Sequence, residues 1–157
     1  MCQQAENWST KNGRQNGVLM NKRHLYKAKR VDNKEWVIGS YIYIPKSGDE
    51  KNGHHFIVAD ALEECYEVFP STVCQCTGIR SGKFEYIWES DIVIAEYCKD
   101  EIRHEFTGYV KYNHFGKFIV QSVKDISFCT DLDTVYDIIG NSFDNPEYLY
   151  DSLIYLL

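Results

Sequence analysis

The chain has 157 residues and a formal net charge of −6, with 17 Lys and Arg against 23 Asp and Glu. A chain this acidic is not typical of a general binder of nucleic acid or of anionic membranes. Aromatic residues make up 15% of it, and because aromatic side chains favour pleated, half-buried surfaces, the composition predicts a mainly β protein. The six cysteines come without a signal peptide or an apolar run of roughly 20 residues, so we expect free thiols, a cytoplasmic location and no membrane contact.

Charge is unevenly distributed along the chain. Residues 1–46 hold nine of the Lys and Arg but three of the Asp and Glu, a local charge of +6, which leaves −12 for the remainder. Such a split is typical of a basic contact surface or of self-association between unlike faces. Solvated strand residues are the alternative explanation.

The first part of the chain is expected to contain a tail and a β region. Residues 1–21 are polar and without periodicity, which predicts a flexible tail, and Met20 is a candidate alternative start. Residues 22–90 form the predicted N-terminal β region, which opens with a hairpin of strands 25–31 and 36–44. Gly39 inside the second strand predicts a bulge or a close backbone approach. We expect Pro45 to end that strand, residues 46–53 to form a polar loop, and residues 55–59 to form the next strand.

The second part, residues 91–157, carries closely spaced strand patterns and a closing helix. A turn or helical turn at 70–72 and a strand at 73–77 precede it. The expected strands are 92–97, 106–112, 117–122, 126–129 and 135–140, with a tight turn at 113–116, and they predict a small SH3-like barrel. Asp144 or Asn145 can cap a terminal helix that has Pro146 in its first turn. The fold class is therefore mainly β, or α+β by count of elements.

Three separated motifs resemble those of the YopX-like proteins of phages and prophages. Residues 70–93 resemble the central signature "D/E-P-x-T-V-x-Q-x-T-G-L-x-D-x-N-G-x-x-I-[YFW]-E-G-D-I-V". Residues 28–39 resemble the opening "G-K-R-x-D-N-G-E-W-V-x-G", and residues 139–149 the ending "I-G-N-I-x-[DE]-N-P-E-L-L". The resemblance implies a phage- or prophage-encoded, largely β, self-assembling protein in the cytoplasm of a bacterial host, with no established activity.

The chain departs from the central signature at two places. Ser90 stands where the signature has Gly, and a Ser there is strained if the position requires a positive φ angle. The "D-x-N-G-x" insert is replaced by a different sequence at residues 80–86, which alters the tip of the predicted hairpin.

One basic patch is interleaved with aromatic residues, namely Tyr26 and Trp36. Phosphate attraction and base stacking would suit this composition. Alternatively, the two aromatic residues belong to the core and the lysines protect an exposed sheet edge. The candidate contact residues for nucleic acid or a partner are Arg23, Lys27, Lys29 and Arg30.

No catalytic, metal or cofactor site is predicted. Cys74 and Cys76 share a strand face but lack the spacing of a zinc knuckle, and the five histidines are scattered. Asp91 belongs to the signature, and we expect its carboxylate to accept a backbone N–H at the turn that enters a strand.

The sequence therefore predicts a non-enzymatic interaction module that forms homo-oligomers and binds a host or phage protein. The alternative is a nucleic-acid-binding accessory protein that uses the basic first hairpin.

Overall fold

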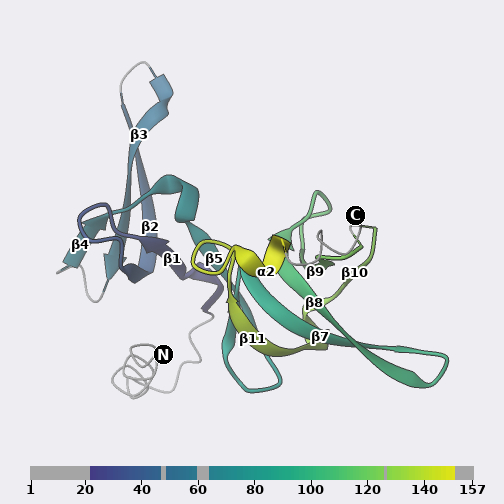
Figure 1. Cartoon of the computed structure of the whole chain (residues 1–157). Coiled ribbons are helices and arrows are strands. Elements are labelled where there is room, and N and C mark those ends of the chain that lie inside the picture. Colours follow the sequence, from purple (N-terminus) through teal and green to yellow (C-terminus); the bar gives the residue numbers. More distant parts are fainter. Residues whose placement is uncertain (1–21, 47–48, 60–63, 126, 151–157) are drawn as a thin grey trace.

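The computed structural model describes residues 22–46, 49–59, 64–125 and 127–150, and these form two antiparallel sheets and a short helix (Figure 1). The six-stranded sheet has the order β4-β3-β2-β1-β5-β6. Its strands are β1 (Tyr26–Lys29), β2 (Trp36–Lys46), β3 (Asp49–Ala59), β4 (Glu64–Glu67), β5 (Cys74–Arg80) and β6 (Tyr86–Trp88). The mainly β prediction is confirmed, whereas the predicted tail and the candidate start at Met20 lie outside the described residues.

The five-stranded sheet has the order β10-β9-β8-β7-β11. Its strands are β7 (Asp91–Lys99), β8 (Ile102–Tyr112), β9 (Phe118–Ser122), β10 (Cys129–Thr130) and β11 (Val135–Asn141). The 3-10 turn η1 (Lys22–His24) precedes β1, η2 (Pro70–Thr72) lies between β4 and β5, and η3 (Leu132–Thr134) lies between β10 and β11. The helix α2 (Glu147–Tyr150) follows β11. In chain order, the six-stranded sheet ends with β6 at Trp88 and the five-stranded sheet begins with β7 at Asp91.

The first sheet is built on the predicted hairpin of β1 and β2, in which Lys29 pairs with Trp36 and Tyr26 with Gly39. Its core consists of Ala28, Val37, Ile57 and Val68. A bridge between Arg30 and Val68 joins the end of β1 to the residue after β4, so the sheet curls around this core. The predicted close approach at Gly39 is confirmed, because a Cβ atom there would lie 2.1 Å from the carbonyl oxygen of Val58.

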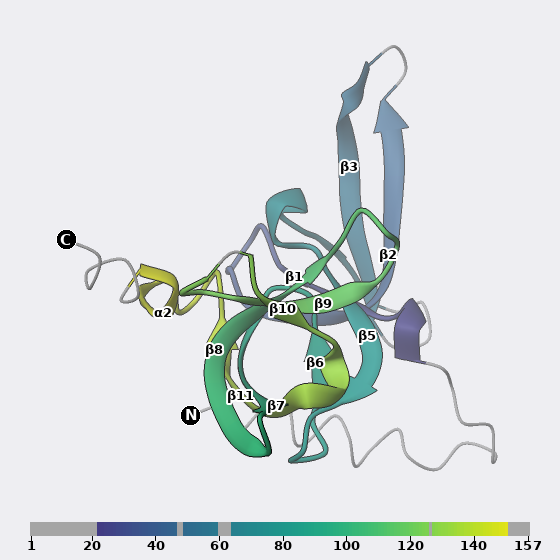
Figure 2. The same ribbon diagram turned by 90° about the vertical axis from the view of Figure 1, so that its right-hand side faces the viewer.

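The second sheet curves strongly around its own core (Figure 2). Val93, Val110 and Val120 fill that core together with Ile87, which comes from β6 of the first sheet. The predicted SH3-like barrel is not closed. Among the described residues β10 pairs with β9 alone and β11 with β7 alone, so these two edge strands of the sheet are not hydrogen-bonded to each other.

The end of β2 differs from the prediction. The strand continues through Pro45 to Lys46, and β3 begins at Asp49 where a polar loop was expected. Pro is tolerated because the pairing of β2 with β1 stops at Gly39, and a strand edge without a neighbour needs no N–H donor. His54 and His55 consequently lie within a strand instead of at its start.

Three short segments can also be compared with their predictions. The predicted strand at 126–129 is reduced, within the described residues, to Cys129–Thr130. The predicted tight turn at 113–116 is confirmed, with Gly116 at φ +82° and Asn113 accepting hydrogen bonds from the backbone N–H groups of Phe115 and Lys117. The closing helix is present over Glu147–Tyr150, and its predicted continuation lies outside the described residues.

Ser90 has a φ angle of +66°, so the signature's Gly position does require the left-handed region. Phe84, on the altered hairpin tip, also has a φ angle of +66°. A non-Gly residue in this region costs roughly 1–2 kcal/mol. The two departures from the signature therefore retain its backbone shape at an energetic cost.

Candidate interaction surface

Lys27, the second residue of β1, lies partly buried at the junction of the two sheets. Its Nζ atom lies 2.7 Å from Oδ1 of Asp91, and the two side chains are 13% and 3% exposed. The indole rings of Trp36 and Trp88 flank the ammonium group, with centroids at 5.3 and 5.5 Å. Lys27 is therefore a structural link between the sheets, with a charge that is largely withdrawn from solvent.

Asp91 completes this junction at the start of β7. Its Oδ2 atom accepts a hydrogen bond of 2.8 Å from the backbone N–H of Trp88, which confirms the structural role predicted for it. Burial raises the pKa of Asp91, and the charge and hydrogen bond of Lys27 act in the opposite direction. Lys27 and the backbone N–H of Trp88 thus favour the ionised carboxylate against the effect of its burial.

Lys29 forms a second link, to the loop before α2. Its ammonium group pairs with Asp144, which also accepts a hydrogen bond of 2.6 Å from Nε1 of Trp36 and one of 2.9 Å from Asn141. Partial burial raises the pKa of Asp144, but the hydrogen bonds from Lys29, Asn141 and Trp36 bring it below the ordinary value. The two lysines therefore pair the basic first part of the chain with the acidic second part.

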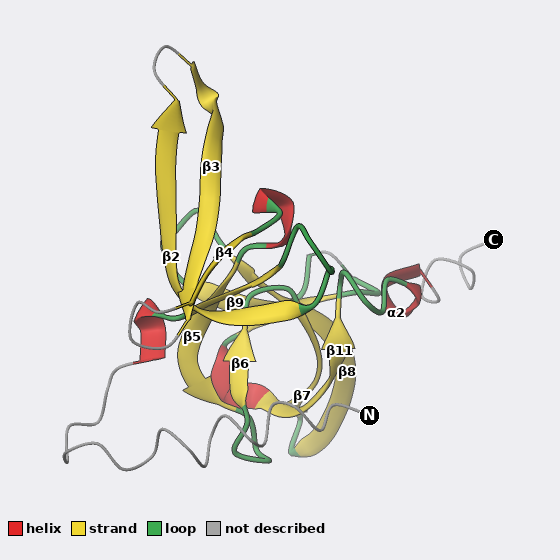
Figure 3. Cartoon of the chain, turned by 90° about the vertical axis from the view of Figure 1, so that its left-hand side faces the viewer, coloured by secondary structure: helices red, strands yellow, loops and turns green. Residues whose placement is uncertain are grey.

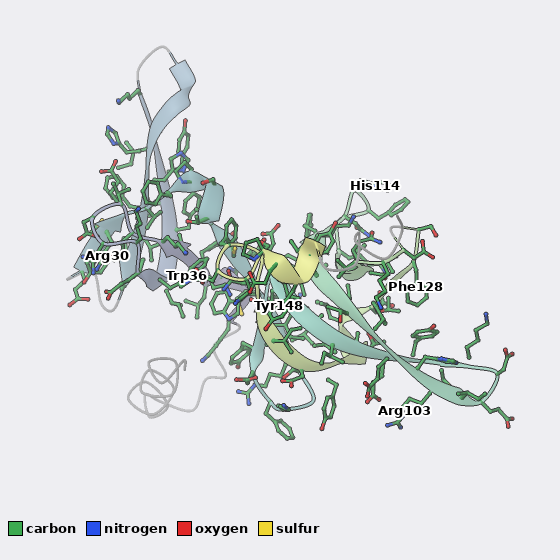
Figure 4. All side chains as sticks on the ribbon, in the orientation of Figure 1. Arg30, Trp36, Arg103, His114, Phe128 and Tyr148 are labelled. Carbon is green, nitrogen blue, oxygen red and sulfur yellow. The ribbon has the colours of Figure 1, made fainter. Side chains whose placement is uncertain are left out.

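Arg30 and Arg23 lie away from this junction. The guanidinium of Arg30 pairs with Asp32 in the β1–β2 turn and lies 3.9 Å from the ring centroid of Tyr66. In Figure 4 the labelled Arg30 lies on the outer side of the first sheet, and Trp36 lies closer to the second. The four predicted contact residues are thus divided among three places, and the structure brings only Lys27 and Lys29 together.

Arg23 borders an open groove of about 520 Å³ between β5, the β8–β9 turn and η3. The backbone carbonyl of Arg23 accepts a hydrogen bond of 3.0 Å from Gln75. Across the groove Lys117 is paired with Asp131 at 2.7 Å. The groove therefore presents mixed charges on a partly apolar floor.

β1 is also an interior strand, between β2 and β5. The alternative explanation, in which the lysines protect a sheet edge, is therefore wrong. The same explanation placed Tyr26 and Trp36 in the core. This is confirmed for Tyr26, which packs against the core of the first sheet.

The β2–β3 hairpin carries a surface that was not predicted from the sequence. Residues 40–46 and 49–55 form a two-stranded arm that extends away from the body in Figures 1, 2 and 3. On one face of this arm Tyr41 and Tyr43 contact the ring of His55. On the other face Ile42 and Ile44 are 41% and 51% exposed. An apolar residue at every position of 41–44 was the available signal, since a strand with one solvated face alternates between apolar and polar residues.

Within the part of the chain that the structure describes, cysteine and histidine side chains do not gather into a site. Burial raises the pKa of Cys74 to about 11 and also raises that of Cys76. His54 pairs with Glu67, and His104 stacks on Tyr97. No group of three potential metal ligands occurs within the described residues, and no helix in that part of the chain is long and apolar enough to cross a membrane.

Comparison with known proteins agrees with the motifs. A search of curated proteins gives no match. The family model described as YopX protein matches residues 25–150, which include both sheets and the helix. The chain therefore belongs to the YopX family.

Proposed function

We propose that the protein is a non-enzymatic interaction module that associates with further copies of itself through the β2–β3 arm. We also propose that it acts in the cytoplasm of a bacterial host as a phage- or prophage-encoded protein, as the motif resemblance implies. The observation that carries the first proposal is the exposed apolar face of the arm, formed by Ile42 and Ile44.

The arm lacks the support that a hairpin normally needs in water. Within the described residues, the pairing of β2 with β1 ends at Gly39, β2 pairs beyond it with β3, and the pairing of β3 with β4 covers Phe56–Ala59 alone. A two-stranded ribbon is marginally stable unless a further layer covers one of its faces. A partner that buries Ile42 and Ile44 would supply that layer.

A second copy fits this requirement because it presents the same surface. Two identical arms related by a two-fold axis would bury both pairs of isoleucines in one contact. Exposed apolar strands on a protruding hairpin otherwise favour uncontrolled aggregation. Self-association therefore explains why the arm is long, apolar on both faces and separate from the core.

The alternative, nucleic-acid binding by the first hairpin, receives less support. Lys27 and Lys29 are paired with carboxylates, and their side chains are 13% and 22% exposed. A phosphate contact at either lysine would have to compete with an existing ion pair. An enzymatic role also receives less support. Where the described residues gather polar groups around a carboxylate with a shifted pKa, at Asp91 and at Asp144, these groups link separate parts of the fold.

The proposal can be tested by light scattering on a size-exclusion column. The double variant Ile42→Thr/Ile44→Thr keeps β-branched side chains, and hence strand propensity, while it makes the exposed face polar. Ile102→Thr is the matched control, since Ile102 is 60% exposed on a different hairpin. Circular dichroism establishes that each variant is folded.

We expect the wild-type protein and Ile102→Thr to elute with a mass that is a multiple of 18.4 kDa, and the double variant to elute as a monomer. A wild-type monomer at every concentration, or a double variant with the wild-type mass, would contradict the proposal.

A further inference from the structure

A second surface lies on the β5–β6 hairpin, remote in the chain from the arm. Two cationic side chains, those of Lys22 and Arg80, lie over the ring of Tyr86 at 4.7 and 4.6 Å. At the hairpin tip Lys83 lies 5.8 Å from the ring of Tyr136, and Phe84 follows it. We call the set Lys22, Arg80, Lys83, Phe84 and Tyr86 the basic-aromatic strip.

Arg80 is held by aromatic contacts in this strip. Its guanidinium donates a hydrogen bond of 3.1 Å to the hydroxyl of Tyr86. Among the described residues no carboxylate lies within ion-pairing distance of Arg80, in contrast to the pairs formed by Lys27, Lys29 and Arg30. An exposed guanidinium stacked on a Tyr ring is oriented to meet an anion from solvent.

Phe84 is costly to the isolated protein in two ways. Its side chain is 78% exposed, so it gains little from burial. Its φ angle of +66° places a bulky residue in the left-handed region, where Gly would be unstrained. A residue that is both strained and exposed points to a role outside the fold.

Acidic groups moderate the charge of the strip. Lys83 pairs with Asp137 at 2.5 Å, and Glu85 is exposed beside Phe84. The partner must therefore combine anionic groups with an apolar surface that can stack, instead of offering charge alone.

We propose that the basic-aromatic strip binds single-stranded nucleic acid. Lys22 and Arg80 contact backbone phosphates, and Phe84 provides a platform on which an unpaired base stacks. A duplex fits less well because its bases are already stacked and cannot reach Phe84. With a chain charge of −6, the binding is weak and falls steeply with salt.

This inference does not depend on self-association, because the strip and the arm share no residue. Fluorescence anisotropy of a labelled oligothymidine of about 20 nucleotides, titrated with the full chain, tests it. The variants are Phe84→Gly, which removes the ring and relieves the backbone, and Arg80→Ala. The controls are Phe115→Gly and Arg103→Ala. Phe115 is 80% exposed in the β8–β9 turn, and the side chain of Arg103 is 77% exposed on β8.

We expect the protein to bind the oligothymidine in about 50 mM salt, and the affinity to fall strongly when the salt is raised to about 200 mM. Loss of one stacked base by Phe84→Gly weakens the affinity about tenfold. Arg80→Ala weakens it and lowers the slope of log affinity against log salt by about 0.7, the value for one single-strand phosphate contact. The controls bind as the wild-type protein does. No binding at low salt, or equal affinities for Phe84→Gly, Arg80→Ala and the wild-type protein, would overturn the proposal.

Discussion

Replacement of Asp91 by Asn tests the role of the buried pair at the sheet junction. The substitution keeps the volume of the side chain and an oxygen that can still accept the N–H of Trp88. It removes the counter-charge of Lys27, whose ammonium group lies 2.7 Å from Asp91 and between two indole rings. The variant therefore leaves a buried cation without its partner.

Breaking a buried ion pair from one side typically costs 3–5 kcal/mol. Lys27 retains 13% exposure, so its long side chain can move its charge partly toward water. We therefore expect the lower end of the range, a loss of about 3 kcal/mol in the free energy of unfolding. With an m-value of about 1.5 kcal/mol per molar urea, the midpoint falls by about 2 M.

Urea denaturation followed by tryptophan fluorescence measures this shift, since Trp36 and Trp88 flank the pair. The double variant Lys27→Met/Asp91→Asn removes both charges and fills the site with an apolar side chain, so it should recover most of the loss. Asp131→Asn is the matched control, because the Lys117–Asp131 pair is exposed and its loss should leave the midpoint in place.

The reasoning fails if Asp91→Asn leaves the midpoint within experimental error of the wild-type value. It also fails if the effects of Lys27→Met and Asp91→Asn simply add, since independent side chains would then account for both.

Three further predictions concern backbone strain, thiol burial and acid. Ser90→Gly should stabilise the chain by about 0.5–1 kcal/mol, because Gly adopts the φ angle of +66° without strain; a lower midpoint of thermal denaturation would contradict it. Iodoacetamide should leave Cys74 and Cys76 unmodified in the folded protein, as peptide mass mapping would show, because both are buried and the pKa of Cys74 is about 11. The thiols expected to react are those of Cys65, Cys98 and Cys129, and equal labelling of Cys74 would refute the assignment. The pKa of Asp144 is lowered from 3.8 in the folded chain, so its contribution to stability is present above the unfolded value and is lost as the pH falls through the folded value. The indole N–H resonance of Trp36 should therefore shift below about pH 4, and a resonance that is independent of pH in this range would show that the contact does not depend on the charge of Asp144.

Local chemistry made several features predictable from the sequence. The first hairpin follows from two alternating runs around a turn, and Asp91 was expected to accept a backbone hydrogen bond because it precedes a strand. From the motif resemblance, which places Gly at this position, strain at Ser90 was expected on the condition that the position requires a positive φ angle, and its φ angle is +66°. Each of these inferences depends on residues close together in the chain.

The features that the sequence did not reveal depend on distant partners. The position of Lys27 is decided by Asp91, 64 residues later, and no local pattern indicates that pairing. The strands predicted at 36–44 and 55–59 are shorter than β2 and β3 as observed. Pro45 and the polar residues that follow it are typical of a loop, whereas a strand edge without a neighbour tolerates both. Closure of the second sheet depends on pairing between its edge strands β10 and β11, which local strand propensity does not determine.

Hydrogen exchange of the arm at two protein concentrations tests most directly the claim that a second copy covers it. We expect the amides of residues 40–44 and 46 to exchange slowly in concentrated protein and rapidly after dilution, because the covering copy then dissociates. The amides of β8 and β9 around Val110 and Val120, which lie in the core of the second sheet, should be unaffected by dilution. Arm amides that exchange at the same rate at both concentrations, whether fast or slow, would contradict self-association through this surface.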